Sequence, residues 1–262
     1  MTTASGDGHV DWTAAAEAAK ASTDPGALDV TPEDRDGYAA DVRDARSRLQ
    51  SVGDVEFDLP RAIEVQNRHH WIDANVRTFE RVMAPLETHA PEVLPDVTRA
   101  VNSGTMSVML TFLATRVLGQ YDPLLLAEGD EDHGLYFVHP NIVTVARELD
   151  VDYPRFRRWI AFHEVAHAAE FGAAPWLSDH LERRMERGIE ALASGEIDRE
   201  AFRELDATMT AVEGYAELLM DRAFDAEYAD LRAKLDARRR GGGPLAKLVR
   251  RLLGLGLKRR QY

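Results

Sequence analysis

Cysteine is absent from the 262-residue chain. Its absence excludes disulfide scaffolds, thiol nucleophiles and metal sites with cysteine ligands, so any metal must be held by histidine and carboxylate. Long hydrophobic runs are missing too. The best candidate, residues 106–118, is interrupted by Thr111, Thr115 and Arg116, and no membrane-spanning segment is expected. Residues 1–20 lack the basic region and the continuous apolar stretch of a secretory signal, so we expect a cytoplasmic location.

Basic residues are fewer than acidic ones, 32 against 45, which gives a net charge of −13. Nine of the basic residues lie in residues 237–262, where there is no acid, so residues 1–236 hold 23 basic and 45 acidic residues, a net charge of −22. This charge disfavours nucleic-acid binding by the main body. Because salt screens such self-repulsion, we also expect a halophilic protein from a salt-rich cytoplasm.

The basic C-terminal stretch contains an amphipathic segment, residues 245–253. Such a segment could dock on anionic lipid or on an acidic partner. We favour the alternative that it packs on the acidic body of its own chain.

Hydrophobic periodicity predicts a predominantly helical α+β protein. We expect strands at residues 62–66, 118–121 and 135–139, the last two joined by an acidic turn at 128–132. We expect one or two helices over residues 91–118 with a break near Asn102-Ser103-Gly104. The expected regions are an N-terminal helical region (1–117), a core carrying the chemistry (118–236) and a basic tail (237–262) on the same domain, and a single domain is the alternative. A long amphipathic helix is expected to run through residues 75–83, and the other expected helices span residues 14–21, 32–50, 142–149, 153–171, 175–193 and 199–224.

The clearest motif is an HExxH element, His163-Glu164-Val165-Ala166-His167, inside a strongly helical run. A helix places residues four apart on one face, so both imidazoles can reach one ion while Glu164 lies beside them to hold a water. The motif predicts zinc bound by His163 and His167, with Glu164 as the general base of a hydrolase.

Catalytic zinc takes three protein ligands, and our choice for the third is Glu213. Glu217 lies four residues further along the same expected helix and is predicted to accept a hydrogen bond from a ligand histidine. Glu170 shares the face of His163 and His167 and is the second choice for the third ligand. Three other histidines are expected to be structural: His69, His70 and His180.

Five segments resemble the zincin-like metallopeptidase type 2 family, often labelled as associated with deazaflavin coenzyme biosynthesis. They are VLGQYDP, LYFVHPNIVTVARELDVD, FRRWIAFHEVAHAAEFGAAPWLSDHL, VEGYAELLMD and LKRRQY. The resemblance runs from about Val10 to Tyr262 and implies a gluzincin-like zincin core with Glu213 as the third ligand and Glu217 behind it. Where this chain has Ala166 and Glu170 the family usually carries Thr and Gln. The extra carboxylate could strengthen binding of a cation or face water, and we favour the second alternative.

The predicted function is therefore a zinc metallopeptidase with one zinc ion per chain, acting on a peptide or protein. Tyr121, His139 and Tyr215 are candidates to stabilise the oxyanion, and residues 135–138 could pair with an extended substrate. One alternative is a non-peptidase zinc amidohydrolase. Another is an inactive, metal-stabilised interaction protein. Its supporting feature is that family members typically continue past the position of Tyr262, so this chain looks short at its C-terminus. In that case a fourth protein ligand such as Glu170 would close the site.

Overall fold

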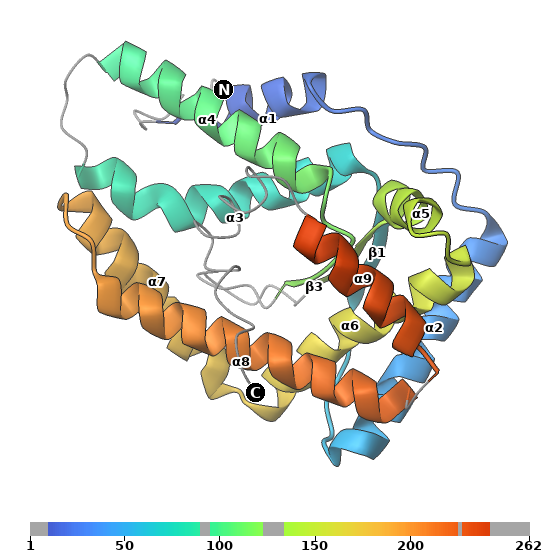
Figure 1. Ribbon diagram of the computed structural model, residues 1–262. Helices are drawn as coiled ribbons and strands as arrows, with labels where there is room; N and C mark the ends of the chain where they lie inside the picture. The colour runs from blue at the N-terminus through green and yellow to red at the C-terminus, as the bar shows by residue number, and fades with distance from the viewer. Residues whose placement is uncertain (1–9, 90–94, 123–133, 225–226, 242–262) are drawn as a thin grey trace.

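The computed structural model describes residues 10–89, 95–122, 134–224 and 227–241. They form a small sheet between two groups of helices, which confirms the predicted helix-rich α+β class (Figure 1). The elements are α1 (Trp12–Ala21), α2 (Pro32–Gly53), β1 (Ala62–Gln66), α3 (Arg68–His89), α4 (Pro95–Ala114), β2 (Gly119–Asp122), β3 (Gly134–Val138), α5 (His139–Glu148), α6 (Tyr153–Ala173), α7 (Trp176–Ala193), α8 (Arg199–Phe224) and α9 (Ala229–Gly241).

The three described strands are ordered β1-β3-β2, with β1 parallel and β2 antiparallel to the central strand β3. The antiparallel pair confirms the expectation for β2 and β3, while their predicted acidic turn lies outside the described residues. Because β3 is paired on both sides, it cannot add a substrate strand. The prediction that residues 135–138 pair with substrate is wrong, and the short apolar run belongs to a buried central strand, as its pattern of burial shows.

Each face of the sheet is covered by its own hydrophobic core. Leu135 and Phe137 point into the larger core, which they share with residues of α2, α5, α6, α8 and α9. Val138 points to the opposite face, where it packs with residues of α1, α3 and α4. The alternation along β3 therefore builds a three-layer arrangement, with α1, α3 and α4 on one side (Figure 1).

Helix α6 carries the HExxH motif through the middle of the larger core. Asp152 caps its start by accepting a hydrogen bond from the Arg155 amide at 3.2 Å, and Pro154 lies in the first turn. Buried side chains include Phe156, Phe162 and Glu164, so the helix is enclosed on several faces. An enclosed helix offers a fixed frame for side chains that must hold a precise geometry.

Helix α4 runs unbroken through Asn102-Ser103-Gly104, so the predicted break is wrong. The Ser103 hydroxyl donates to the Arg99 carbonyl one turn earlier at 2.7 Å and accepts from the Asp11 amide at 2.7 Å. The polar residue thus serves as the docking point for the start of α1. The part of the expected helix at residues 91–94 lies outside the described residues.

The first two expected regions share one sheet and the larger hydrophobic core. Strand β1 pairs with β3 along its length, and α2 packs against α6. The basic segment 245–253 lies outside the described residues. Among the described helices none is long and apolar enough to cross a membrane.

Candidate metal centre

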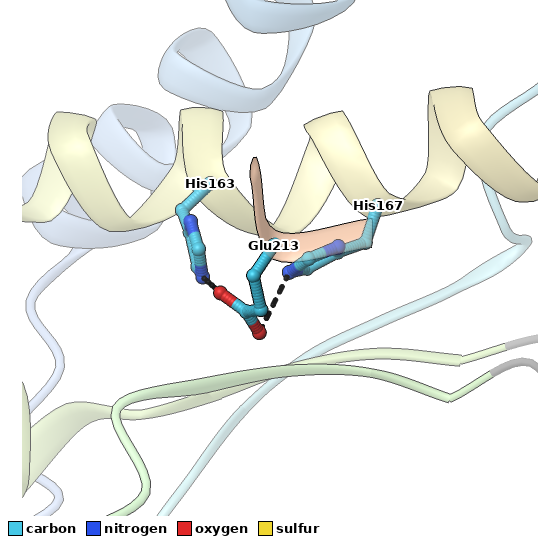
Figure 2. A group of neighbouring side chains, drawn as sticks. All are labelled: His163, His167 and Glu213. Atoms are coloured by element: carbon cyan, nitrogen blue, oxygen red, sulfur yellow. Dashed lines mark ion pairs between the residues drawn. The ribbon is translucent and has the colours of Figure 1, made fainter. Parts of the chain in front are cut away.

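Two histidines of α6 and one glutamate of α8 converge on a single point (Figure 2). Atom Nε2 of His163 lies 3.9 Å from Oε2 of Glu213, and Nε2 of His167 lies 3.9 Å from Oε1 of the same carboxylate. One ligand atom from each residue falls within 4.8 Å of the other two. Within the described residues this is the one His, Asp and Glu group of this kind.

The donor set fits a zinc ion. Zinc–ligand bonds of about 2.0–2.2 Å in a tetrahedron set the ligand atoms about 3.4 Å apart. The three ligand atoms lie within 4.8 Å of one another, so shifts of about 1.4 Å or less close the group around an ion. The two imidazole centroids are 4.7 Å apart and their planes cross at 77°. The Glu213 side chain is 42% exposed, so solvent reaches this group of side chains.

Glu170 holds the far side of the His167 ring. Its Oε2 lies 2.8 Å from Nδ1 of His167, while Nε2 faces Glu213. A carboxylate accepts hydrogen bonds, so Nδ1 carries a proton, and a neutral His167 keeps the Nε2 lone pair free for a metal. Glu170 is only 5% exposed, so the expectation that it faces water is wrong. Its contact with Nδ1 also places it behind the ligand ring, where it does not act as the third ligand.

Glu217, one turn after Glu213, accepts a hydrogen bond from Arg232 of α9 at 3.1 Å. Glu217 was predicted to accept a hydrogen bond from a ligand histidine, and for His167 the structure shows such a carboxylate partner in Glu170. Sequence reasoning did place Glu170 on the face of His167, because the two residues are three apart in a helix. It could not show that α8 would cover and bury the carboxylate.

Glu164 lies against strand β2. It is buried, and its Oε2 accepts a hydrogen bond from the Tyr121 amide at 3.0 Å. Burial raises the pKa of Glu164 to about 7 in the metal-free protein, although the charge of His167 and the Tyr121 hydrogen bond act to lower it. A carboxyl group with a pKa near neutrality is suited to both accept and return a proton.

The pKa of His167 moves the other way from most buried histidines. Burial lowers it, but the Glu170 hydrogen bond and the charges of Glu164, Glu170 and Glu213 outweigh burial and raise it to about 9 in the metal-free protein. The raised pKa of His167 reflects the negative charge of the carboxylates around its ring. A cation that replaces the proton meets the same favourable field.

The three oxyanion candidates lie in different places. The backbone of Tyr121 contacts Glu164 and its ring packs on Phe171 of α6, so this residue borders the site. His139 belongs to a separate buried cluster, where its Nδ1 lies 3.2 Å from the Tyr38 hydroxyl and 3.3 Å from that of Tyr153. Tyr215 lies on α8 and is 39% exposed.

Two of the histidines expected to be structural contact the protein elsewhere. Atom Nε2 of His69 lies 2.7 Å from the Thr23 carbonyl, and Nε2 of His180 lies 3.1 Å from the Thr208 hydroxyl. Both contacts join separate parts of the fold, and neither histidine is in the metal group.

A helix-borne histidine pair, a glutamate from a second helix and a buried acid beside them are typical of metallohydrolases. The family model described as zincin-like metallopeptidase matches residues 10–197 and 188–262. The chain therefore belongs to the zincin-like metallopeptidase family, which in general binds zinc.

A solved structure supports the fold. The crystal structure of a protein from Chloroflexus aurantiacus, described as a candidate hydrolase with a novel fold, is 30% identical with a TM-score of 0.77. The similarity covers 97% of this chain and 83% of the other. No match was found among curated proteins.

Proposed function

We propose that the protein is a zinc-dependent peptidase that binds one zinc ion through His163, His167 and Glu213. The observation that carries the proposal is the convergence of these three side chains beside the buried carboxyl of Glu164. Zinc bound there supplies a Lewis acid that lowers the pKa of a coordinated water toward about 7. Residues of the chain supply the remaining steps.

Glu164 is the general base in this proposal. Its Oε2 is held by the Tyr121 amide, so Oε1 is the oxygen left to take the proton from the attacking water. The same carboxyl then returns the proton to the leaving amine. Glu170 keeps His167 in the orientation and protonation state that leaves Nε2 for the metal.

A peptide substrate is supported by the family and by the edge of β2. The Val138 amide donates to the Leu118 carbonyl, and ladder bonds alternate along an antiparallel pair, so the backbone groups of Gly119 and Tyr121 face away from β3. An extended peptide could pair with the carbonyls on this edge beside Glu164.

The structure offers an observation against the alternative of an inactive, metal-stabilised protein. That alternative needs a fourth protein ligand, and Glu170, the residue considered for it, is engaged on the opposite side of the His167 ring.

Metal content and turnover test the proposal together. We expect about one zinc per wild-type chain by elemental analysis, loss of zinc in Glu213→Ala, and full zinc with at least a 100-fold loss of peptide hydrolysis in Glu164→Gln. Hydrolysis is measured on a mixture of peptides by mass spectrometry. Equal activity in the three proteins, or no zinc in the wild type after zinc is supplied, would overturn the proposal.

A further inference from the structure

We infer that Gly119 is a positioning residue for Glu164, because its missing side chain is the space that the Glu164 carboxyl occupies on the edge of β2. The functional part of this inference rests on the proposed role of Glu164 as general base. The steric part stands on the contacts alone.

The contact between the strand and the glutamate leaves no room for a methyl group. A Cβ atom built on Gly119 would lie 2.5 Å from Cγ of Glu164, 2.7 Å from its Oε1 and 2.8 Å from its Cδ. Ordinary carbon contacts are about 3.5–4.0 Å, so all three distances are clashes. The three Glu164 atoms in these clashes are two carboxylate atoms and the carbon that carries the carboxylate.

Backbone conformation does not explain the glycine. Within the described residues the glycines with positive φ are Gly26 and Gly195, and Gly119 lies in a regular strand register opposite Phe137. Other residues adopt such a backbone freely. The requirement at position 119 is therefore one of space.

Neither partner can move away at low cost. Glu164 is 6% exposed on the enclosed helix α6, and its Oε2 is bonded to the Tyr121 amide two residues along the same strand. From the other face β2 is held by Gln120, whose side chain accepts from the Trp71 indole at 2.7 Å and donates to Asn75 at 2.9 Å. An alanine at 119 must push the carboxylate off the Tyr121 amide.

Hydroxamate binding measures where the carboxylate lies without any substrate. Acetohydroxamate chelates an active-site metal, and its hydroxyl proton can pass to a carboxylate held beside the metal, which strengthens binding through a charge-assisted hydrogen bond. We use the cobalt-loaded full chain and follow its visible spectrum. We expect Glu164→Gln and Gly119→Ala each to bind acetohydroxamate about 10- to 100-fold more weakly, both with full cobalt content.

The double variant separates positioning from general damage. When Glu164 is already Gln, Gly119→Ala should weaken acetohydroxamate by less than about 3-fold, because residues that act together are not additive. Gly104→Ala is the matched control, because a Cβ there meets no atom within 4 Å and should leave the affinity unchanged. Wild-type affinity in Gly119→Ala, an additive loss, or loss of cobalt from Gly119→Ala would each overturn the inference.

Stability supplies a second test that needs no metal. Gly119→Ala should lower the Tm of the metal-free protein when Glu164 is present, and should leave Tm nearly unchanged in a Glu164→Ala background, where the clashing atoms are gone. An equal loss in both backgrounds, or failure of both to fold, would overturn the inference. A wild-type chain that binds no cobalt or zinc would overturn the proposed function. The Tm changes of Gly119→Ala with and without Glu164 would still decide the role of Gly119.

Discussion

Glu170 connects the two helices of the metal group. Its carboxylate accepts from Nδ1 of His167 on α6 and from the backbone amide of Ala216 on α8. Burial raises the pKa of Glu170, against the lowering effect of these hydrogen bonds. A buried carboxyl behind a ligand histidine fixes the ring and increases its basicity, so Glu170 belongs to the metal site although it does not touch the metal position.

Changing Glu170 to Gln should weaken zinc binding about 10- to 100-fold. The amide keeps an acceptor for Nδ1 but removes the charge that favours the ligand form of the ring. A competition titration with a zinc chelator measures the affinity. Glu186→Gln, on the exposed side of α7, is the matched control and should keep the wild-type affinity, and an unchanged affinity in Glu170→Gln would contradict the assignment.

The stability of the metal-free protein should fall as pH rises from about 5 to about 9. The pKa of His167 is raised from 6.5 to about 9, so its contribution is complete below about 6.5 and is lost as pH rises through 9. The pKa of Glu164 is raised from 4.5 to about 7, so the folded state again holds more protons than the unfolded state between these values.

Thermal unfolding at several pH values measures this slope. His167→Gln should flatten the upper part of the curve, between pH 6.5 and 9, because it removes the group that titrates there. A Tm that rises across the same range would contradict the assigned partners of His167.

Spacing alone predicted that His163 and His167 share a face, and the structure brings them together with Glu213 as the sequence and the family resemblance implied. Gly119 carried no such signal. Its partner Glu164 is far away along the chain, and the need for a glycine appears only when β2 packs against α6. Local pattern finds residues on one helix, while contacts between elements need the fold.

At the scale of elements, a buried ion pair joins α2 to α6. The Arg157 side chain donates to Asp41 at 2.7 Å, and both residues are buried. The guanidinium also lies over the rings of Tyr38 and Tyr153. This junction holds the N-terminal half of α6, and with it the direction in which His163 and His167 point.

Arg157→Met should lower the free energy of unfolding by about 3–5 kcal/mol, because it leaves the Asp41 carboxylate buried without its partner. Urea unfolding of the metal-free protein measures the change. The double variant Arg157→Met with Asp41→Leu should recover much of the loss, since it removes both charges. A double variant no more stable than Arg157→Met would show that the pair has another role.

Helix starts were predicted well where the sequence contains recognisable capping residues. Thr31 and Asp34 form a capping box at the start of α2 with Pro32 as the first helical residue, and the expected start at Pro32 is confirmed. The order of the strands in the sheet could not be predicted from the sequence. The sequence shows that residues 135–138 are mostly apolar, but it does not show which strands pair with them. These pairing strands decide whether a strand is central or lies at an edge.

At the scale of the whole molecule, a net charge of −13 predicts salt-dependent stability. Because salt screens the repulsion among surplus carboxylates, Tm should rise by several degrees as KCl rises from low to molar concentration. Differential scanning calorimetry measures the change. Sorbitol of equal osmolarity is the control for solvent effects without charge, and a falling Tm in KCl would contradict the expectation of a salt-adapted protein.

Ion pairs join helix α9 to both helices that supply the metal group. Its Arg232 pairs with Glu217 and Asp221 of α8, and its Asp230 pairs with Arg155 of α6 at 2.6 Å. An ion that draws α6 and α8 together should therefore slow the amide hydrogen exchange of α9, a helix that contributes no ligand to it. Because such coupling is reciprocal, removing the ion pairs of Arg232 should in turn weaken binding of the ion.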